Sequence, residues 1–97
     1  MLLSIVVLSY NRPEQIRRIF DNLIGITCND CNIIIKDDAS PCIPAISSVV
    51  AEYKEKIDLE VVMHVNDLNL GYDRNLLDAF YVTKSDYIFL LSDDDYL

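Results

Sequence analysis

Four short apolar runs alternate along this chain with three longer amphipathic stretches. The apolar runs are Leu2 to Leu8, Cys31 to Lys36, Leu59 to Val65 and Tyr87 to Leu91. Runs of this length that are rich in aliphatic residues are typical of strands buried on both faces of a parallel sheet. Parallel strands need right-handed crossovers, which place helices on the faces of the sheet. The sequence therefore predicts an α/β fold of the order βαβαβαβ, with a mostly parallel sheet and helices on both faces.

The three amphipathic stretches are predicted to be helices. Pro13 suits the first turn of the first helix because it lacks an N–H, with Asn11 or Ser9 as its cap, and Gly25 ends it. The expected buried faces are Ile16, Ile19, Phe20, Leu23 and Ile24 in the first helix, Ile43, Ile46, Val49, Val50, Tyr53 and Ile57 in the second, and Leu76, Leu77 and Phe80 in the third. Each helix thus has an apolar side that can pack on the sheet.

Size and charge limit what such a chain can bind. It has 97 residues, 52% of them hydrophobic, which suits one domain over residues 1–97 with a packed core. Acidic residues outnumber basic ones 16 to 8, giving a net charge of -8. No cluster of Lys and Arg is present to neutralise a phosphate backbone. We therefore do not expect a nucleic-acid partner.

The amino terminus bears on the location of the protein in the cell. Met1 to Leu8 is too short for a membrane span and lacks the basic start and cleavage site of a signal peptide. A cytoplasmic location is therefore the default expectation, and membrane association of a longer, full-length protein stays open.

Cys28 and Cys31 lie between the first helix and the second strand, and Cys42 lies beyond that strand. We expect all three to be reduced structural thiols.

Polar side chains follow each predicted strand. They are Ser9 to Arg12, Asp37 to Ser40, Asn66 and Asp67, and Ser92 to Asp95. Any one of these groups alone is typical of a turn or a helix cap. The carboxyl ends of parallel strands meet at one edge of a sheet, however, and ligands of open α/β sheets bind outside that edge. We therefore expect these residues to lie along one rim.

Asp93, Asp94 and Asp95 follow the last apolar run directly. Two unit charges about 4 Å apart repel by roughly 4 kcal/mol at an effective dielectric of about 20. A hard, oxygen-seeking cation, Mg²⁺ or Mn²⁺, would neutralise the group and hold an anionic diphosphate. Tyr10 offers a ring on which a base can stack, and Asp38 can accept a hydrogen bond from a base or a ribose. The residues therefore predict binding of a nucleoside diphosphate that is bridged to the protein by the metal ion.

Four stretches carry a family resemblance. They are SIVVLSYNRPEQIRRIFDNL, IIIKDDAS, NLGYDRNLLDAF and DYIFLLSDDDYL. In this order and spacing the chain resembles the opening half of the family 2 glycosyltransferases. The resemblance covers essentially the whole chain and ends just after the acids of a DxD-type motif. It implies a GT-A fold, whose first half is a Rossmann-like nucleotide-binding unit.

The resemblance also implies an activity and a set of site residues. The activity is metal-assisted, inverting transfer of a glycosyl group from a nucleoside diphosphate sugar, expected to be a UDP-sugar, to an acceptor hydroxyl. The implied nucleotide-binding residues are Tyr10, Asn11, Asp38, Arg74 and Asp93, and the implied ligands of Mn²⁺ or Mg²⁺ are Asp94 and Asp95. Asp38 would bind the pyrimidine edge and Asp93 the ribose. The usual acids read D-x-D-D, so the Ser92 to Asp95 stretch leaves Asp94 and Asp95 as alternative metal ligands, with Asp94 favoured.

The family's general base and most of its acceptor pocket come after the DxD-type stretch. The catalytic base is therefore unidentified and is expected beyond Leu97, the last residue of this sequence. We expect residues 1–97 to be the donor-binding half of a truncated transferase, without the acceptor half and with no transferase activity alone. The strand at 87–91 would then present an unpaired apolar edge through which the chain self-associates.

Two other functions account for parts of the sequence. A phosphorylated receiver-type switch needs paired acids after the first strand, where this chain has Tyr10 and Asn11. A non-enzymatic nucleotide- or metal-binding module that depends on a partner chain stays open. His64 alternates with Val62 within a strand, which favours a structural role over that of a general base.

Overall fold

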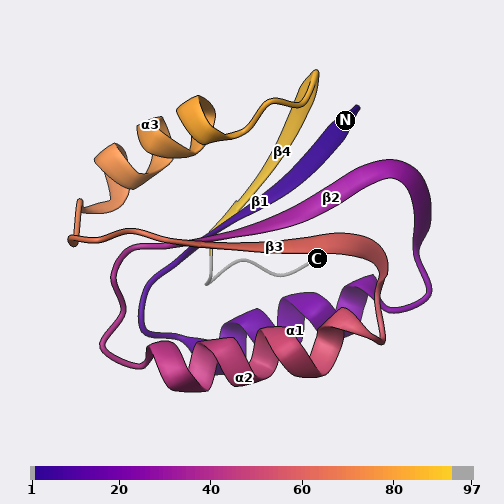
Figure 1. Cartoon of the computed structure of the whole chain (residues 1–97), viewed down its shortest axis with the longest axis horizontal. Helices are drawn as coiled ribbons and strands as arrows, with labels where there is room; N and C mark the ends of the chain where they lie inside the picture. Colours follow the sequence, from indigo (N-terminus) through magenta and orange to yellow (C-terminus); the bar gives the residue numbers. More distant parts are fainter. Residues whose placement is uncertain (1, 93–97) are drawn as a thin grey trace.

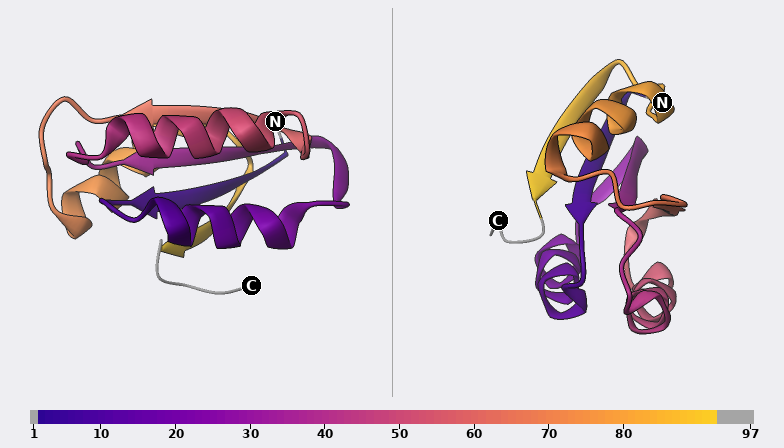
Figure 2. Two further views of the ribbon diagram at one scale, coloured as in Figure 1. Left: turned by 90° about the horizontal axis from the view of Figure 1, so that it is seen from below. Right: turned by 90° about the vertical axis from the view of Figure 1, so that its left-hand side faces the viewer.

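The computed structural model describes residues 2–92. It contains one four-stranded sheet of order β3-β2-β1-β4, in which every strand pair is parallel (Figure 1). The strands are β1 (Leu3–Ser9), β2 (Thr27–Asp37), β3 (Asp58–Val65) and β4 (Tyr87–Ser92), and the helices are α1 (Pro13–Leu23), α2 (Ile43–Lys54) and α3 (Tyr72–Val82). The helices α1 and α2 cover one face of the sheet and α3 lies on the other (Figure 2). The predicted α/β fold with helices on both faces is confirmed.

The strand order reverses at β1. The chain builds outward from β1 to β2 and β3, and it then returns to place β4 on the other side of β1. The carboxyl ends of β1, β2 and β3 meet in register, since Ser9 pairs with Asp37 and Asp37 with Val65. The loops that follow these strands therefore start at one edge of the sheet, as predicted.

The main apolar core lies between the sheet and the pair α1 and α2. It contains Val7, Ile33 and Ile35 from the strands, together with the predicted helix residues Ile16, Ile19, Phe20, Leu23, Ile46, Val49, Val50 and Tyr53. Phe20 stacks on Tyr53 with 5.3 Å between ring centroids, which joins the two helices. Ile24 was predicted to be buried, but it follows the last turn of α1 and is exposed.

The α3 face has a much smaller apolar core. Its buried members are Val6, Leu8, Ile34 and Ala79. The prediction that Leu77 and Phe80 are buried is wrong, because these side chains are 60% and 51% exposed. The helix instead turns Asn75 and Ala79, which are one turn apart, toward the sheet. Only Leu76 of the predicted apolar face packs against this cluster, as a partly buried residue.

The predicted caps of α1 are also wrong. The N-cap of α1 is Arg12, and no side chain caps it. The Ser9 hydroxyl instead donates to Asp37, at 3.0 Å. Asn11 has a φ of 56°, and its N–H donates to the Ser40 hydroxyl at 2.7 Å. Both residues therefore connect β1 to the loop after β2 rather than cap the helix.

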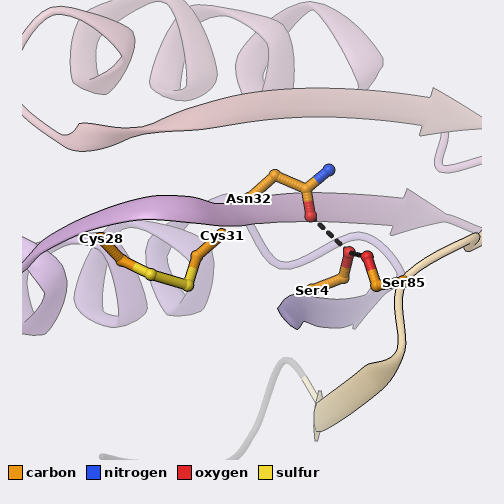
Figure 3. Close-up of a disulfide and its surroundings, with 5 residues drawn as sticks. All are labelled: Ser4, Cys28, Cys31, Asn32 and Ser85. Atoms are coloured by element: carbon orange, nitrogen blue, oxygen red, sulfur yellow. Dashed lines mark hydrogen bonds between the residues drawn. A yellow bond between two sulfur atoms is a disulfide. The ribbon is translucent and has the colours of Figure 1, made fainter. Parts of the chain in front are cut away.

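Cys28 and Cys31 form a disulfide, with 5.5 Å between their Cα atoms (Figure 3). The prediction of reduced thiols is wrong here because β2 begins at Thr27, earlier than expected, and bulges. The register of β2 against β3 shifts between the pair Thr27↔Asp58 and the pair Asn32↔Glu60. Over this interval the chain advances five residues on β2 but only two on β3, which is a bulge in β2. The disulfide closes this bulge, and Cys42 is the free cysteine.

The disulfide gives a direct stability prediction. Replacing Cys28 and Cys31 by Ser should lower the free energy of unfolding by about 2 kcal/mol, because a short loop is no longer closed in the unfolded chain. Urea unfolding measures this, with Cys42→Ser as the matched control. Alkylation of the unfolded, unreduced protein should modify one thiol. Modification of all three would show that the bond is absent.

The strand β4 is an edge strand among the described residues. It pairs with β1 on one side, and Tyr87 and Phe89 on it are exposed. Self-association through residues 87–91 stays a prediction. Sedimentation velocity should show association that increases with concentration and that Phe89→Lys reduces. A compact monomer at high concentration would contradict this prediction.

Candidate functional site

A cleft of about 400 Å³ lies at the carboxyl end of β1. Its walls come from the end of β1 and the loop that follows it, from the loop after β2, and from the start of α3 with the loop before it. The lining residues are Leu8, Ser9, Tyr10, Arg12, Asp38, Asn69, Gly71, Tyr72 and Asn75. The cleft thus lies on the rim where the sequence placed the ligand site.

Asp37 joins the end of β1 to the loop after β2. Its side chain is fully buried and accepts hydrogen bonds from the Ser9 hydroxyl at 3.0 Å, the Ser40 N–H at 2.8 Å and the Ser40 hydroxyl at 2.6 Å. These bonds hold the end of β1 against the loop after β2. Ala39 within that loop has a φ of 59°, which turns the chain sharply between Asp37 and Ser40. Asp37 therefore has a structural role.

Asp38 lies on the cleft wall and is 4% exposed. Its Oδ1 accepts the Leu70 N–H at 2.6 Å and the Asn66 amide at 3.0 Å, and its Oδ2 accepts the Gly71 N–H at 2.9 Å. A carboxylate has about four acceptor positions, so one remains on Oδ2. Asp38 therefore anchors the loop before α3 and keeps acceptor capacity for one further donor.

The structure brings some of the predicted site residues together and not others. Tyr10, with a side chain 45% exposed, shares the cleft with Asp38. Asn11 and Arg74 are exposed and do not line it.

The remaining predicted site residues fall at the end of the chain. The implied ribose and metal ligands, Asp93, Asp94 and Asp95, lie outside the described residues. Leu97, beyond which the general base is expected, also lies outside them. The ribose contact, the metal site and the position of the catalytic base therefore stay predictions.

Several residues that line the cleft were not among the predicted site residues, and Arg12, Asn69 and Tyr72 are the most informative of them. Arg12 belongs to the rim stretch after β1 but was given no role, and Asn69 and Tyr72 flank the turn at Gly71. Gly71 has a φ of 81°, a conformation that glycine adopts without strain, and it presents its N–H to Asp38. The sequence signal that could have indicated Asn69 and Tyr72 is the turn NLGY, because its glycine places the neighbouring side chains at the start of α3.

A second hollow of about 390 Å³ lies beside β3, and His64 lines it with Asp67 and Asp78. His64 does not line the first cleft. The pKa of Asp78 is held below its usual range, chiefly by a hydrogen bond from Lys36.

Within residues 2–92, no group of three or more His, Cys, Asp or Glu side chains is arranged to hold a metal ion. No helix in this part of the chain is long and apolar enough to cross a membrane.

Comparison with known sequences decides the family. The sequence model of glycosyl transferase family 2 matches residues 4–97. The chain belongs to glycosyl transferase family 2. This confirms the resemblance seen in the sequence.

Relatives of this family 2 chain include named transferases. It is 34% identical over 101 residues to the poly(ribitol-phosphate) beta-glucosyltransferase of Bacillus spizizenii, covering 100% of this chain and 15% of that protein. It is 26% identical over 99 residues to the abequosyltransferase RfbV of Salmonella typhimurium, covering 100% of this chain and 29% of that protein. The family 2 chain therefore spans less than a third of the length of these relatives.

Solved structures confirm the fold. The family 2 chain superposes on S. aureus TarS 1-349 with a TM-score of 0.76 at 21% identity, covering 99% of this chain and 28% of that one. A second structure of S. aureus TarS gives a TM-score of 0.77 and is covered over 17% of its length. The expected GT-A architecture is thereby confirmed for the family 2 chain.

Proposed function

We propose that residues 1–97 form the donor-binding unit of a glycosyltransferase. The reaction is transfer of a glycosyl group from a nucleoside diphosphate sugar, with UDP as the nucleotide, to an acceptor hydroxyl, with inversion at the anomeric carbon. The observation that carries this proposal is the cleft between Tyr10 and Asp38 at the carboxyl edge of a parallel sheet. Membership of family 2 and the transferase names of two relatives support it.

The cleft offers the contacts that a pyrimidine nucleotide needs. The exposed Tyr10 ring is a stacking surface for the base, and the remaining acceptor position of Asp38 Oδ2 suits a base N–H. Arg12 is a cation on the cleft wall and can offset diphosphate charge in a chain of net charge -8. In the proposal, Asn11 contributes through its backbone, and Arg74 acts from the first turn of α3.

A divalent cation completes the proposed site. The strand β4 ends at Ser92, which pairs with Leu8, and Leu8 lines the cleft. Asp93, Asp94 and Asp95 follow directly in the sequence, and carboxylates are the ligands that Mg²⁺ and Mn²⁺ prefer. In the proposal Asp93 binds ribose, and Asp94 or Asp95 holds the metal. When bound, the metal would stabilise the leaving diphosphate as a Lewis acid.

Binding of UDP in the presence of Mn²⁺ tests the site by calorimetry. Tyr10→Ala should weaken the affinity by about tenfold or more, because base stacking on an aromatic ring is lost. Tyr10→Phe keeps the ring and should bind almost as well as the wild type.

The matched control is Tyr81→Ala, which removes a tyrosine that is 84% exposed on α3 and does not line the cleft. This variant should bind UDP like the wild type. Equal affinity of the Tyr10→Ala variant and the wild type would show that the base does not stack on Tyr10.

The chain alone should transfer no sugar. Among the described residues that line the cleft, Asp38 is the one carboxylate, and three of its acceptor positions are filled within the protein. No residue up to Leu97 is proposed as the base that deprotonates the acceptor. Incubation with a radiolabelled UDP-sugar and candidate acceptors should give no labelled product above a protein-free blank. Transfer that the Asp38→Ala variant abolishes would contradict this prediction.

Nucleotide binding without turnover would also agree with a non-enzymatic module that is completed by a partner chain. The exposed edge of β4 is the observation that favours this second function. Adding a separately produced carboxyl-terminal part of a family 2 relative distinguishes the two. Restored transfer supports the donor-binding unit, and binding without transfer supports the module.

A further inference from the structure

Lys36 is fully enclosed by the protein, with a side chain 0% exposed. An ammonium group that loses its water costs several kcal/mol unless it is paired and its donors are satisfied. The three protons of Lys36 meet three oxygens. Its Nζ lies 2.7 Å from Asp78 Oδ2 and 3.1 Å from Asn75 Oδ1, and it also donates to Asn66 Oδ1. The buried cation is therefore fully paired, between β2, the end of β3 and α3.

The cation fixes which way the Asn66 amide points. An ammonium can face only the carbonyl oxygen of an amide, so the amide nitrogen of Asn66 must face the other way. That nitrogen donates to Asp38 Oδ1 at 3.0 Å and to Asn75 Oδ1 at 2.8 Å. Without Lys36, the buried Asn66 Oδ1 would lose this donor, and the side chain would have to move to find another. The cation and the Asp38 carboxylate therefore hold the amide from its two ends.

The orientation of Asp38 in turn holds one wall of the cleft. Its carboxylate binds the N–H groups of Leu70 and Gly71, and Gly71 and the adjacent Tyr72 line the cleft. Lys36 does not line the cleft itself. It reaches the loop at 69–72 through two side chains, Asn66 and then Asp38, and it also donates directly to Asn75, which lines the cleft.

We propose that Lys36 is a positioning residue, which sets the Asn66 amide and through it the Asp38 carboxylate and the nucleotide-facing wall formed by residues 69–72. Its effect on nucleotide affinity rests on the proposed function. Its effect on Asp38 and on the loop does not, so the two can be tested separately.

A simpler role must be separated from this one. The bond from Lys36 to Asp78 also docks α3, whose apolar core is small, onto the sheet. Asp78→Asn removes the charge of this docking contact but keeps an oxygen that can accept from Lys36, and it leaves the bonds from Lys36 to Asn66 and from Asn66 to Asp38 in place. Lys36→Met keeps the length of the side chain and removes every donor. The two variants therefore separate docking from positioning.

The first readout is the amide NMR spectrum of the ligand-free chain. In the Lys36→Met variant the Leu70 and Gly71 N–H signals should move upfield, as their bonds to a carboxylate are lost or lengthened. The same signals should stay in place in the Asp78→Asn variant, even if its melting temperature falls. Equal movement of these signals in both variants, in proportion to lost stability, would overturn the proposal.

Asn66→Ala is the second variant, and it covers the case in which Lys36→Met does not fold. It keeps the pair of Lys36 and Asp78 and removes the relay to Asp38. It should shift the Leu70 and Gly71 signals in the same direction as Lys36→Met. Unchanged signals in Asn66→Ala would overturn the proposal.

The second readout is affinity for UDP with Mn²⁺. Lys36→Met and Asn66→Ala should each weaken binding by about tenfold, as expected when a hydrogen bond to a charged group is lost, and Asp78→Asn by less than about twofold. If the wild type does not bind UDP, the proposed function fails, and the NMR readout still decides the role of Lys36. If the wild type binds and Lys36→Met binds equally well, the positioning role is overturned.

Discussion

The carboxyl end of β2 carries three consecutive charged residues, Lys36, Asp37 and Asp38, and all three are buried. Successive side chains of a strand point to opposite faces, so these residues reach in different directions. Lys36 meets α3 and the end of β3, Asp37 meets the end of β1, and Asp38 meets the loop before α3. Burial without partners would be costly for each of them. The arrangement of the loops around the cleft therefore depends on this one strand end.

The two faces of the sheet are stabilised in different ways. The helices α1 and α2 cover one face and α3 lies on the other (Figure 2). The first face has a large apolar core, whereas α3 rests on a few apolar contacts and on the paired charge of Lys36. The cleft is built partly on the α3 side, where hydrogen bonds rather than packing define the geometry. Hydrogen bonds are directional, so this side can hold polar groups at fixed positions. The apolar side supplies most of the burial that stabilises the fold.

Much of this architecture was predictable from sequence because buried parallel strands leave a simple signal. The runs ending at Leu8, Lys36 and Val65 predicted strands and the common edge at which their loops meet. The bulge at Cys28 was not predictable, because periodicity does not report how one strand registers against the next. The buried face of α3 was misassigned because the helix turns Asn75 toward the sheet, where it meets the buried Lys36, and hydrophobic periodicity does not report a polar contact of this kind.

The candidate site shows the same limit. Tyr10 and Asp38 were found because each follows a strand, and they do share a cleft. Their neighbours in the sequence have different roles, since Asp37 joins the end of β1 to the loop after β2 and Asn11 does not line the cleft. Two adjacent acids at a strand end look equivalent in the sequence until their hydrogen-bond partners are known. Tyr72 was missed because its position depends on the turn at Gly71 and on the anchoring of that turn by Asp38.

Mapping the UDP contact by amide chemical shifts would test the central claim most directly. The titration would be run with Mg²⁺ on the uniformly labelled chain, after its spectrum has shown that it is folded. The account predicts saturable shifts at Tyr10, Arg12, Asp38, Gly71 and Tyr72, with the signals of α2 and of the last turn of α1 unchanged. Absence of shifts in a folded sample, or shifts confined to another surface, would contradict the assignment of this cleft to the nucleotide.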